Sequence, residues 1–186
     1  MALEAQISEI ADREAIKQCL YLYCRGIDRR SPELLNKLFW PDSTVEYGIF
    51  NGGGSEFSLS ICDWLEGGGV ISTAHHLGNI VIALDGNSAH TESYLNAHHT
   101  IRGDGELCSD CMIGARYQDR FEKRDNEWRI VFRRLVYDWF RTFPDTFDWK
   151  AGALGVTSEN ATIGGASDDQ WDTLNKAMGM ATLRAS

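Results

Sequence analysis

Two adjacent histidines stand in the segment "STAHHLGN", residues 72–79, which otherwise predicts the start of a β-strand. An imidazole exchanges protons near neutral pH, so His75 and His76 are candidates for acid–base chemistry. Successive side chains of a strand point to opposite faces, so the two cannot share one. If His75 points inward, Leu77 and Asn79 should do so as well.

The same rule separates His98 from His99, which we expect on the partner strand. One histidine of each pair should face the interior, and the other should meet solvent or a subunit contact. Alternation alone does not say which.

An aspartate near the end of the first predicted helix could complete an acid–base pair. Asp28 follows Tyr23 by five residues, where an amphipathic helix turns its apolar side toward a sheet. A carboxylate beside a buried imidazole accepts the Nδ1 hydrogen and favours the imidazolium. The alternative is that Asp28 begins a loop and pairs with Arg29 or Arg30.

Tyr47 is a further candidate, because it alternates with Val45 in a predicted strand and could place a phenol in the same interior. Phenols donate hydrogen bonds to developing oxyanions without a change of charge. The alternative is packing, with the hydroxyl at the rim.

The elements that position these residues begin with three predicted helices. The first spans residues 8–31, with Ser8 as its cap. The second spans residues 31–41, with Ser31 as its cap, Pro32 at its first position and a stop near Pro41. The third spans residues 56–67. A strand over residues 44–50 lies between the second and third helices.

Two hairpins follow, each with a recognisable turn. Residues 73–84 and 88–102 flank "DGN", and residues 111–124 and 127–140 flank "DN". Helices followed by long antiparallel strands predict the α+β class in one domain, residues 1–140. We expect residues 141–186 to be an extension that packs on the domain or on a neighbouring subunit, with a short helix in "DDQWDTLNKAM".

Composition excludes several classes of function. The formal charge is −9, and no basic stripe offers phosphates a partner, so nucleic acid is not expected. Neither a long apolar run nor a basic leader is present, so we expect no membrane association and a cytoplasmic location. The five cysteines suit reduced core thiols, and the CxxC at 108–111 lacks the second pair of a zinc site and favours a strand start.

Several ordered motifs together resemble the SnoaL-like branch of the nuclear transport factor 2 (NTF2-like) superfamily. They are "YLYCRGIDRRSPELLNKLFWPDSTVEY", "TAHHLGN", "AHTESYLNAHH" and "GARYQDRFEKRDNEWRI", within about residues 5–140. The resemblance implies a curved antiparallel sheet closed by three N-terminal helices into a cone with an internal pocket. It also implies a homodimer or homotrimer. The closest motifs are those of scytalone dehydratase, bile acid 7α-dehydratase and hexachlorocyclohexane dehydrochlorinase.

The resemblance also implies roles for individual residues. Asp28 and His75 fall on the dyad of those enzymes, His75 because it lies four residues before Asn79. Tyr47 matches a tyrosine that holds a water or carbonyl oxygen in scytalone dehydratase. His99 matches that enzyme's second histidine, or His98 does if the hairpin register slips by one.

Substrate-binding residues follow less directly. Tyr23 occupies the place of a tyrosine of the bile acid enzyme, whereas Ile27, Ala115, Tyr117 and Tyr137 stand where the family enzymes carry other residues, which argues against scytalone and bile acids as substrates. The many aromatic side chains expected around the pocket favour an apolar or aromatic substrate. The predicted substrate-binding residues are Tyr23, Trp40, Trp64, Tyr117 and Tyr137.

The function expected from these residues is a cofactor-independent lyase that eliminates water, or a small fragment such as formaldehyde, from an aryl or polycyclic alcohol. The same dyad would serve an isomerase or a polyketide cyclase, and the fold also carries non-catalytic ligand-binding modules. A zinc site of His75, His98 or His99 with Asp28 is a further alternative.

Overall fold

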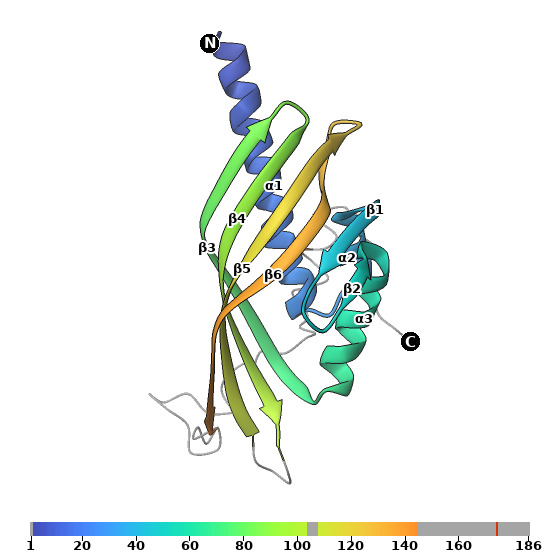
Figure 1. The fold of residues 1–186 in the computed structure, drawn as a ribbon, viewed down its shortest axis with the longest axis vertical. Coiled ribbons are helices and arrows are strands. Elements are labelled where there is room, and N and C mark those ends of the chain that lie inside the picture. Colours follow the sequence, from blue (N-terminus) through green and yellow to red (C-terminus); the bar gives the residue numbers. More distant parts are fainter. Residues whose placement is uncertain (1, 104–107, 145–173, 175–186) are drawn as a thin grey trace.

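The fold is α+β, as expected from the order of helices and hairpins. The computed structural model describes residues 2–103, 108–144 and 174. The elements in chain order are α1 (Leu3–Asp28), α2 (Pro32–Lys37), β1 (Phe39–Glu46), β2 (Asn51–Gly53), α3 (Gly54–Gly67), β3 (Val70–Asp85), β4 (Ser88–Arg102), β5 (Cys108–Arg124) and β6 (Glu127–Pro144) (Figure 1).

The strands form one curved sheet in the order β2-β1-β6-β5-β4-β3. Both predicted hairpins are present, since β3 pairs with β4 and β5 with β6, in each case antiparallel. The prediction of a wholly antiparallel sheet is wrong at β1, which runs parallel to β6 with Val45 opposite Arg133. These two strands are far apart in sequence, so no hairpin turn fixes their relative direction.

Helix α1 begins earlier than predicted, at Leu3, so Ser8 lies inside the helix and does not cap it. The preceding residues include good helix formers such as Leu3 and Ala5, which extend the helix without a side-chain cap. This first part of α1 reaches past the end of the sheet (Figure 1), and Leu3, Ile7 and Ile10 are exposed there.

Helix α2 has the predicted start, because the Ser31 hydroxyl accepts a hydrogen bond from the Leu34 N–H and Pro32 is the first helical residue. It ends at Lys37, before Pro41, which lies within β1 instead. Pairing of β1 with β6 is irregular between Phe39 and Thr44. A proline, which lacks an N–H, is tolerated in such a stretch.

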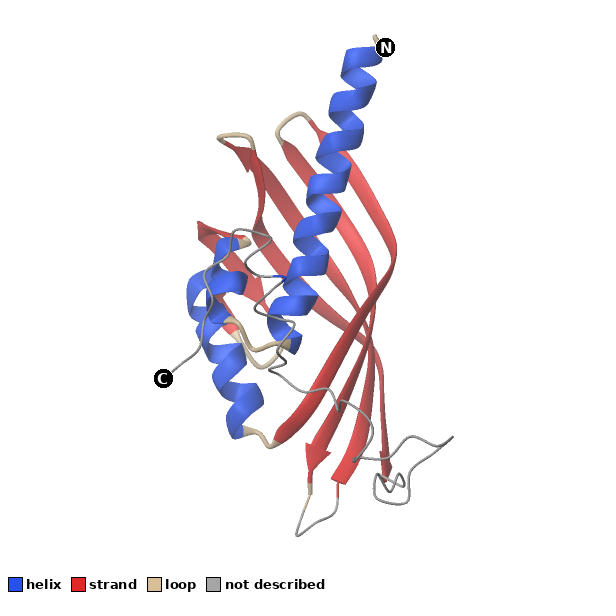
Figure 2. Cartoon of the chain, turned by 180° about the vertical axis from the view of Figure 1, so that it is seen from behind, coloured by secondary structure: helices blue, strands red, loops and turns tan. Residues whose placement is uncertain are grey.

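The core lies between the helices and one face of the sheet (Figure 2). Helix α1 packs on β3 and β6, and its buried residues recur at helical spacing at Ile16, Leu20, Tyr23 and Ile27. Helix α3 contributes buried residues including Phe57. The C-terminal end of α1 is therefore held against the inner face of the sheet.

Strand β3 contains a bulge that changes which residues face the core. Asn79 has φ +48°, and the pairing with β4 is interrupted between Gly78 and Val81. Before the bulge Leu77 packs on the core, and after it Ile80 does so. Asn79 is exposed, so the expectation that it points inward with His75 is wrong.

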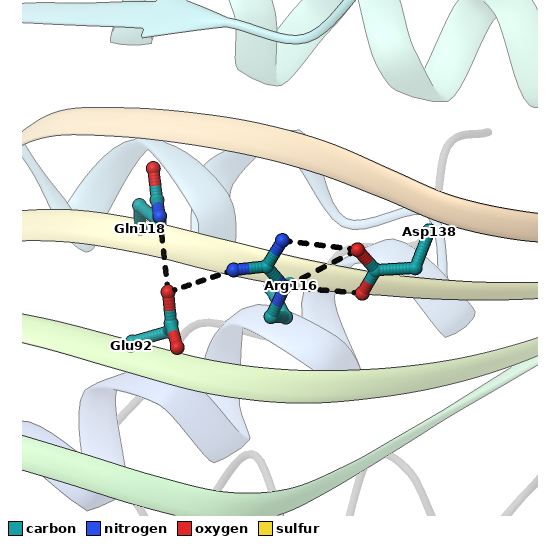
Figure 3. A network of polar contacts seen from close by, with 4 residues as sticks. All are labelled: Glu92, Arg116, Gln118 and Asp138. Atoms are coloured by element: carbon teal, nitrogen blue, oxygen red, sulfur yellow. Dashed lines mark hydrogen bonds and ion pairs between the residues drawn. The ribbon is translucent and has the colours of Figure 1, made fainter.

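The opposite face of the sheet carries a charged network across three strands (Figure 3). Arg116 on β5 donates to both oxygens of Asp138 on β6 and to Glu92 on β4. Gln118 also donates to Glu92. The network ties neighbouring strands together on the side away from the helices.

The cysteines are free thiols, four of them buried and Cys108 half-buried. Burial raises the pKa of Cys19, Cys24 and Cys62 to about 12. The CxxC segment forms the start of β5. Among the described residues, no group of three His, Cys, Asp or Glu side chains is placed to hold a metal ion.

None of the described helices is long and apolar enough to cross a membrane. Residues 141–144 continue β6, so the change of pattern expected at 141 comes slightly later. The remainder of the expected extension, including the helix expected in residues 168–178 apart from Leu174, lies outside the described residues.

Candidate active site

Asp28 and His75 form a close pair where the end of α1 meets β3. His75 Nδ1 donates to Asp28 Oδ1 at 2.6 Å, and the His75 backbone N–H donates to Asp28 Oδ2 at 3.0 Å. The imidazole is 4% exposed and the carboxylate 17%. Because Nδ1 carries the shared hydrogen, the Nε2 lone pair is left to accept a proton.

Of the two arginines expected as alternative partners of Asp28, Arg30 has a different contact. Arg30 donates instead to the Val70 carbonyl oxygen. His76, the neighbour of His75, is exposed, as strand alternation requires.

His75 borders an internal cavity of about 360 Å³ between α3 and strands β3 to β6. Its wall is mostly apolar and includes no Lys, Arg, Asp or Glu among the described residues. The lining side chains that carry polar groups are those of His75, His99, Tyr47, Trp64, Tyr137 and Cys111. Such a cavity suits an uncharged, largely apolar molecule that carries few polar groups.

A second imidazole lies beside the first in the wall of this cavity. The rings of His75 and His99 lie 5.6 Å apart and nearly perpendicular. Burial, with a smaller contribution from His75, lowers the pKa of His99 to about 4, so His99 is neutral at pH 7. Its Nδ1 has no hydrogen-bond partner among the described residues.

His98 lies on the other face of the sheet, with a 41% exposed side chain and its Nε2 3.3 Å from Asp110 Oδ1. The register of β4 against β5 places His99 opposite Cys111. Of the two alternatives, His99 therefore lines the cavity.

Tyr47, which directly follows β1, brings a phenol to the same cavity. Its hydroxyl lies 3.1 Å from the hydroxyl of Tyr117. Burial raises the pKa of Tyr47, so the phenol is neutral and can donate a hydrogen bond.

The carboxylate of the dyad also borders a second, outer hollow of about 330 Å³. Its lining includes Arg25 and Arg29 of α1 and His76 of β3. His75 thus lies in a wall shared by the inner cavity and the outer hollow, and Asp28 lies on the outer side of that wall.

Comparison with known proteins places the chain in a family. A model of the SnoaL-like domain matches residues 8–134, most of the chain. The chain is a SnoaL-like protein. Uncharacterized proteins of Mycobacterium tuberculosis and Mycobacterium bovis are 31% identical to it over 129 residues, which is 68% of this chain and 86% of each relative.

Solved structures confirm the NTF2-like fold of this SnoaL-like protein. A provisionally named scytalone dehydratase from Novosphingobium aromaticivorans superposes with a TM-score of 0.65 at 22% identity, covering 84% of this chain and 99% of that one. A hexachlorocyclohexane dehydrochlorinase gives a TM-score of 0.69 at 19% identity, covering 81% and 99%. At such identities the likeness concerns the fold.

Of the expected substrate-binding residues, the SnoaL-like protein brings only Trp64 and Tyr137 to the cavity. Trp40 lies elsewhere, with its Nε1–H donating to the Glu122 carbonyl oxygen and its ring beneath Arg124 and Arg129. The reason is alternation, since the preceding residue of β1 points into the core.

Tyr23 and Tyr117 are fully buried and do not line the cavity. Both pack against the guanidinium of Arg133, which sequence reasoning missed. Alternation from Ile130 would point Arg133 outward, but a bulge between Ile130 and Phe132 reverses the faces. No turn residue or motif in the sequence signals that bulge.

Proposed function

We propose that this SnoaL-like protein is a cofactor-independent lyase that eliminates water, or a small fragment such as formaldehyde, from an aryl or polycyclic alcohol. The observation that carries the proposal is the Asp28–His75 pair at the wall of an apolar cavity. The fold shared with dehydratase and dehydrochlorinase structures supports this class of reaction without identifying the substrate.

In the proposed reaction His75 Nε2 removes a proton from a carbon of the substrate. The electron pair of that C–H bond forms the new C=C bond while the neighbouring C–O bond breaks. The proton held by His75 then returns to the leaving hydroxide, which departs as water. Asp28 keeps the imidazole in the required tautomer and stabilises the imidazolium in between.

Fragment loss uses the same base on a different proton. His75 removes the hydrogen of a hydroxyl group, the adjacent C–C bond breaks to release the aldehyde, and the proton ends on the carbon that keeps the electron pair. In both cases Tyr47 and His99 donate hydrogen bonds to the oxygen that leaves or gains negative charge. The low dielectric of the cavity strengthens these contacts.

The test is a mass-spectrometric screen of aryl alcohols, diols and hydroxy-ketones with the wild type, His75→Ala and His76→Ala. We expect the wild type and His76→Ala to release water or formaldehyde from at least one compound. Because His75 is the base, turnover by His75→Ala should fall by about 10²- to 10⁴-fold. His76 is the matched control, since it is the adjacent, exposed histidine.

Turnover that survives in His75→Ala would contradict the site assignment. Exchange of substrate carbon-bound hydrogen with D₂O, without loss of mass, would instead indicate an isomerase or cyclase that uses the same dyad. Binding of the same compounds without exchange or turnover would identify a ligand-binding module.

A further inference from the structure

A buried ion pair lies in the core behind the cavity. Arg133 of β6 donates from Nε and Nη2 to the two oxygens of Asp119 on β5, each at 2.7 Å. Both side chains are fully buried. An ion pair of this kind adds little net stability over apolar residues of the same volume, because both charges lose their hydration. Its presence here calls for another explanation.

The guanidinium of Arg133 packs against two tyrosine rings that meet edge to face. Its carbon lies 3.7 Å from the ring centroid of Tyr23 and 4.2 Å from that of Tyr117. A cation over an aromatic face is attracted by the electron density of the ring, and the attraction grows when water is absent. Any negative charge that moves onto the Tyr117 oxygen is therefore stabilised by Arg133.

Tyr117 connects this cation to the cavity. Its hydroxyl lies 3.1 Å from that of Tyr47, and Tyr47 lines the cavity together with His75 and His99. Hydrogen bonds in a chain polarise one another, most strongly where the dielectric is low. The contacts thus run without interruption from Arg133 through Tyr117 to a phenol at the cavity wall.

We propose that Tyr117 and Arg133 are positioning residues for Tyr47. Tyr117 donates its hydroxyl hydrogen to the Tyr47 oxygen, which leaves the Tyr47 hydrogen free to point at a ligand oxygen in the cavity. Arg133 stabilises the partial negative charge that both phenols acquire as they donate. The site so formed favours ligands with an enolate-like or phenolate-like oxygen. This proposal rests on the proposed function only in that Tyr47 contacts the reacting oxygen.

The groups around Tyr47 act on its pKa in opposite directions. Burial is the largest influence and raises it, and the Cys24 thiol adds to the rise. The hydrogen bond with Tyr117 and the charge of Arg133 lower the pKa. These directions give the proposal a spectroscopic readout that needs no substrate.

The experiment replaces Tyr47 in the full chain by a ring-fluorinated tyrosine, whose phenolate absorbance is titrated at lower pH than that of tyrosine. In a Tyr117→Phe background we expect the titration midpoint to rise by about one pH unit, as for the loss of one hydrogen bond. Asp119→Asn should lower the midpoint, because it leaves the charge of Arg133 unneutralised. Tyr94→Phe, at an exposed tyrosine, is the control and should leave it unchanged.

Coupling between the variants separates positioning from general loosening of the core. If Arg133 acts through Tyr117, the effect of Asp119→Asn should shrink by more than half in the Tyr117→Phe background. An unchanged midpoint in Tyr117→Phe, a rise in Asp119→Asn, or simple additivity would each overturn the proposal. The titration measures no turnover, so its result does not depend on whether the lyase screen finds a substrate. Failure of the proposed function and failure of this proposal can therefore be distinguished.

Discussion

The two inward-facing histidines differ in what surrounds them. His75 has a carboxylate at 2.6 Å, whereas His99 is buried with no acid in hydrogen-bond contact among the described residues. For His99, burial dominates and the pKa falls to about 4. The same fold therefore supplies one imidazole with a carboxylate partner and one that stays neutral at pH 7.

This difference predicts an acid-sensitive stability. An unfolded histidine has a pKa of about 6.5, so between pH 6.5 and 4 the unfolded chain binds a proton that folded His99 does not. The free energy of unfolding should fall across this window, by on the order of 3 kcal/mol at its lower end. Urea unfolding of the wild type and His99→Phe at several pH values measures this decrease in the free energy of unfolding. In His99→Phe most of the decrease should be absent.

His90→Gln is the control, because His90 is exposed and its replacement should leave the fall in place. Asp12 and Asp138 do not contribute to the decrease between pH 6.5 and 4. Their pKa values lie below the usual aspartate value, so they titrate in stronger acid. An equal acid dependence in His99→Phe would show that His99 is not responsible.

At the level of the elements, the turns were predictable and the bulges were not. The turn signals at residues 85–87 and 125–126 locate both hairpins, because their residues adopt positive φ at Gly86, Asp125 and Asn126. The faces of β6 depend instead on an irregularity between Ile130 and Phe132 that the sequence does not mark. That is why Arg133 and the burial of Tyr117 behind the cavity were missed.

The dyad, in contrast, was predictable from motif spacing. Asp28 and His75 were matched to family motifs, and the structure brings them into contact, although their role as acid and base stays a prediction. Trp40 was chosen from composition alone, and its placement depended on which face of β1 it occupied. Not every match to a family position was as successful, since Tyr23 does not line the cavity, whereas Trp64, chosen for its aromatic character, does.

The bulge in β3 gives a stability prediction for an element. Asn79 adopts φ +48°, which asparagine tolerates and β-branched residues do not. Asn79→Val should lower the free energy of unfolding by about 1–2 kcal/mol, whereas Asn79→Gly should change it little. Chemical denaturation measures both variants.

The matched control is Ala83→Val, which introduces the same side chain at an exposed position of β3 without positive φ. If Asn79→Val and Ala83→Val were equally stable, backbone strain at the bulge would not be the cause.

At the scale of the whole molecule, the outer face of the sheet carries large exposed apolar side chains beside the Arg116 network of Figure 3. They include Tyr94, Met112, Trp139 and Phe143. Gly114 leaves the space that Trp139 occupies, since a Cβ there would lie 2.1 Å from the indole. A concentration of such groups is typical of a surface that a partner covers.

We therefore predict that the chain forms a homodimer or homotrimer and that the assembly uses this face. Light scattering with size-exclusion chromatography should show an assembly for the wild type and dissociation for Trp139→Glu, with association weakened by at least about 30-fold, as for loss of a buried tryptophan contact. Circular dichroism should be unchanged.

Leu59→Glu is the control for charge, because Leu59 is exposed on α3, away from this face. A monomeric wild type at micromolar concentration, or dissociation by Leu59→Glu alone, would contradict the assignment of the outer face.

The bulge at Asn79 also constrains how the length of the chain can change. Deleting one residue there would restore strict alternation along β3. His75 and Leu77 would then stay on the same face as Ile80 and Ile82, because the bulge is what accommodates the one extra residue of β3. Loss of one residue at this point therefore changes the face of no inward side chain, and descendants of this sequence should lose residue 79 before any other residue of β3.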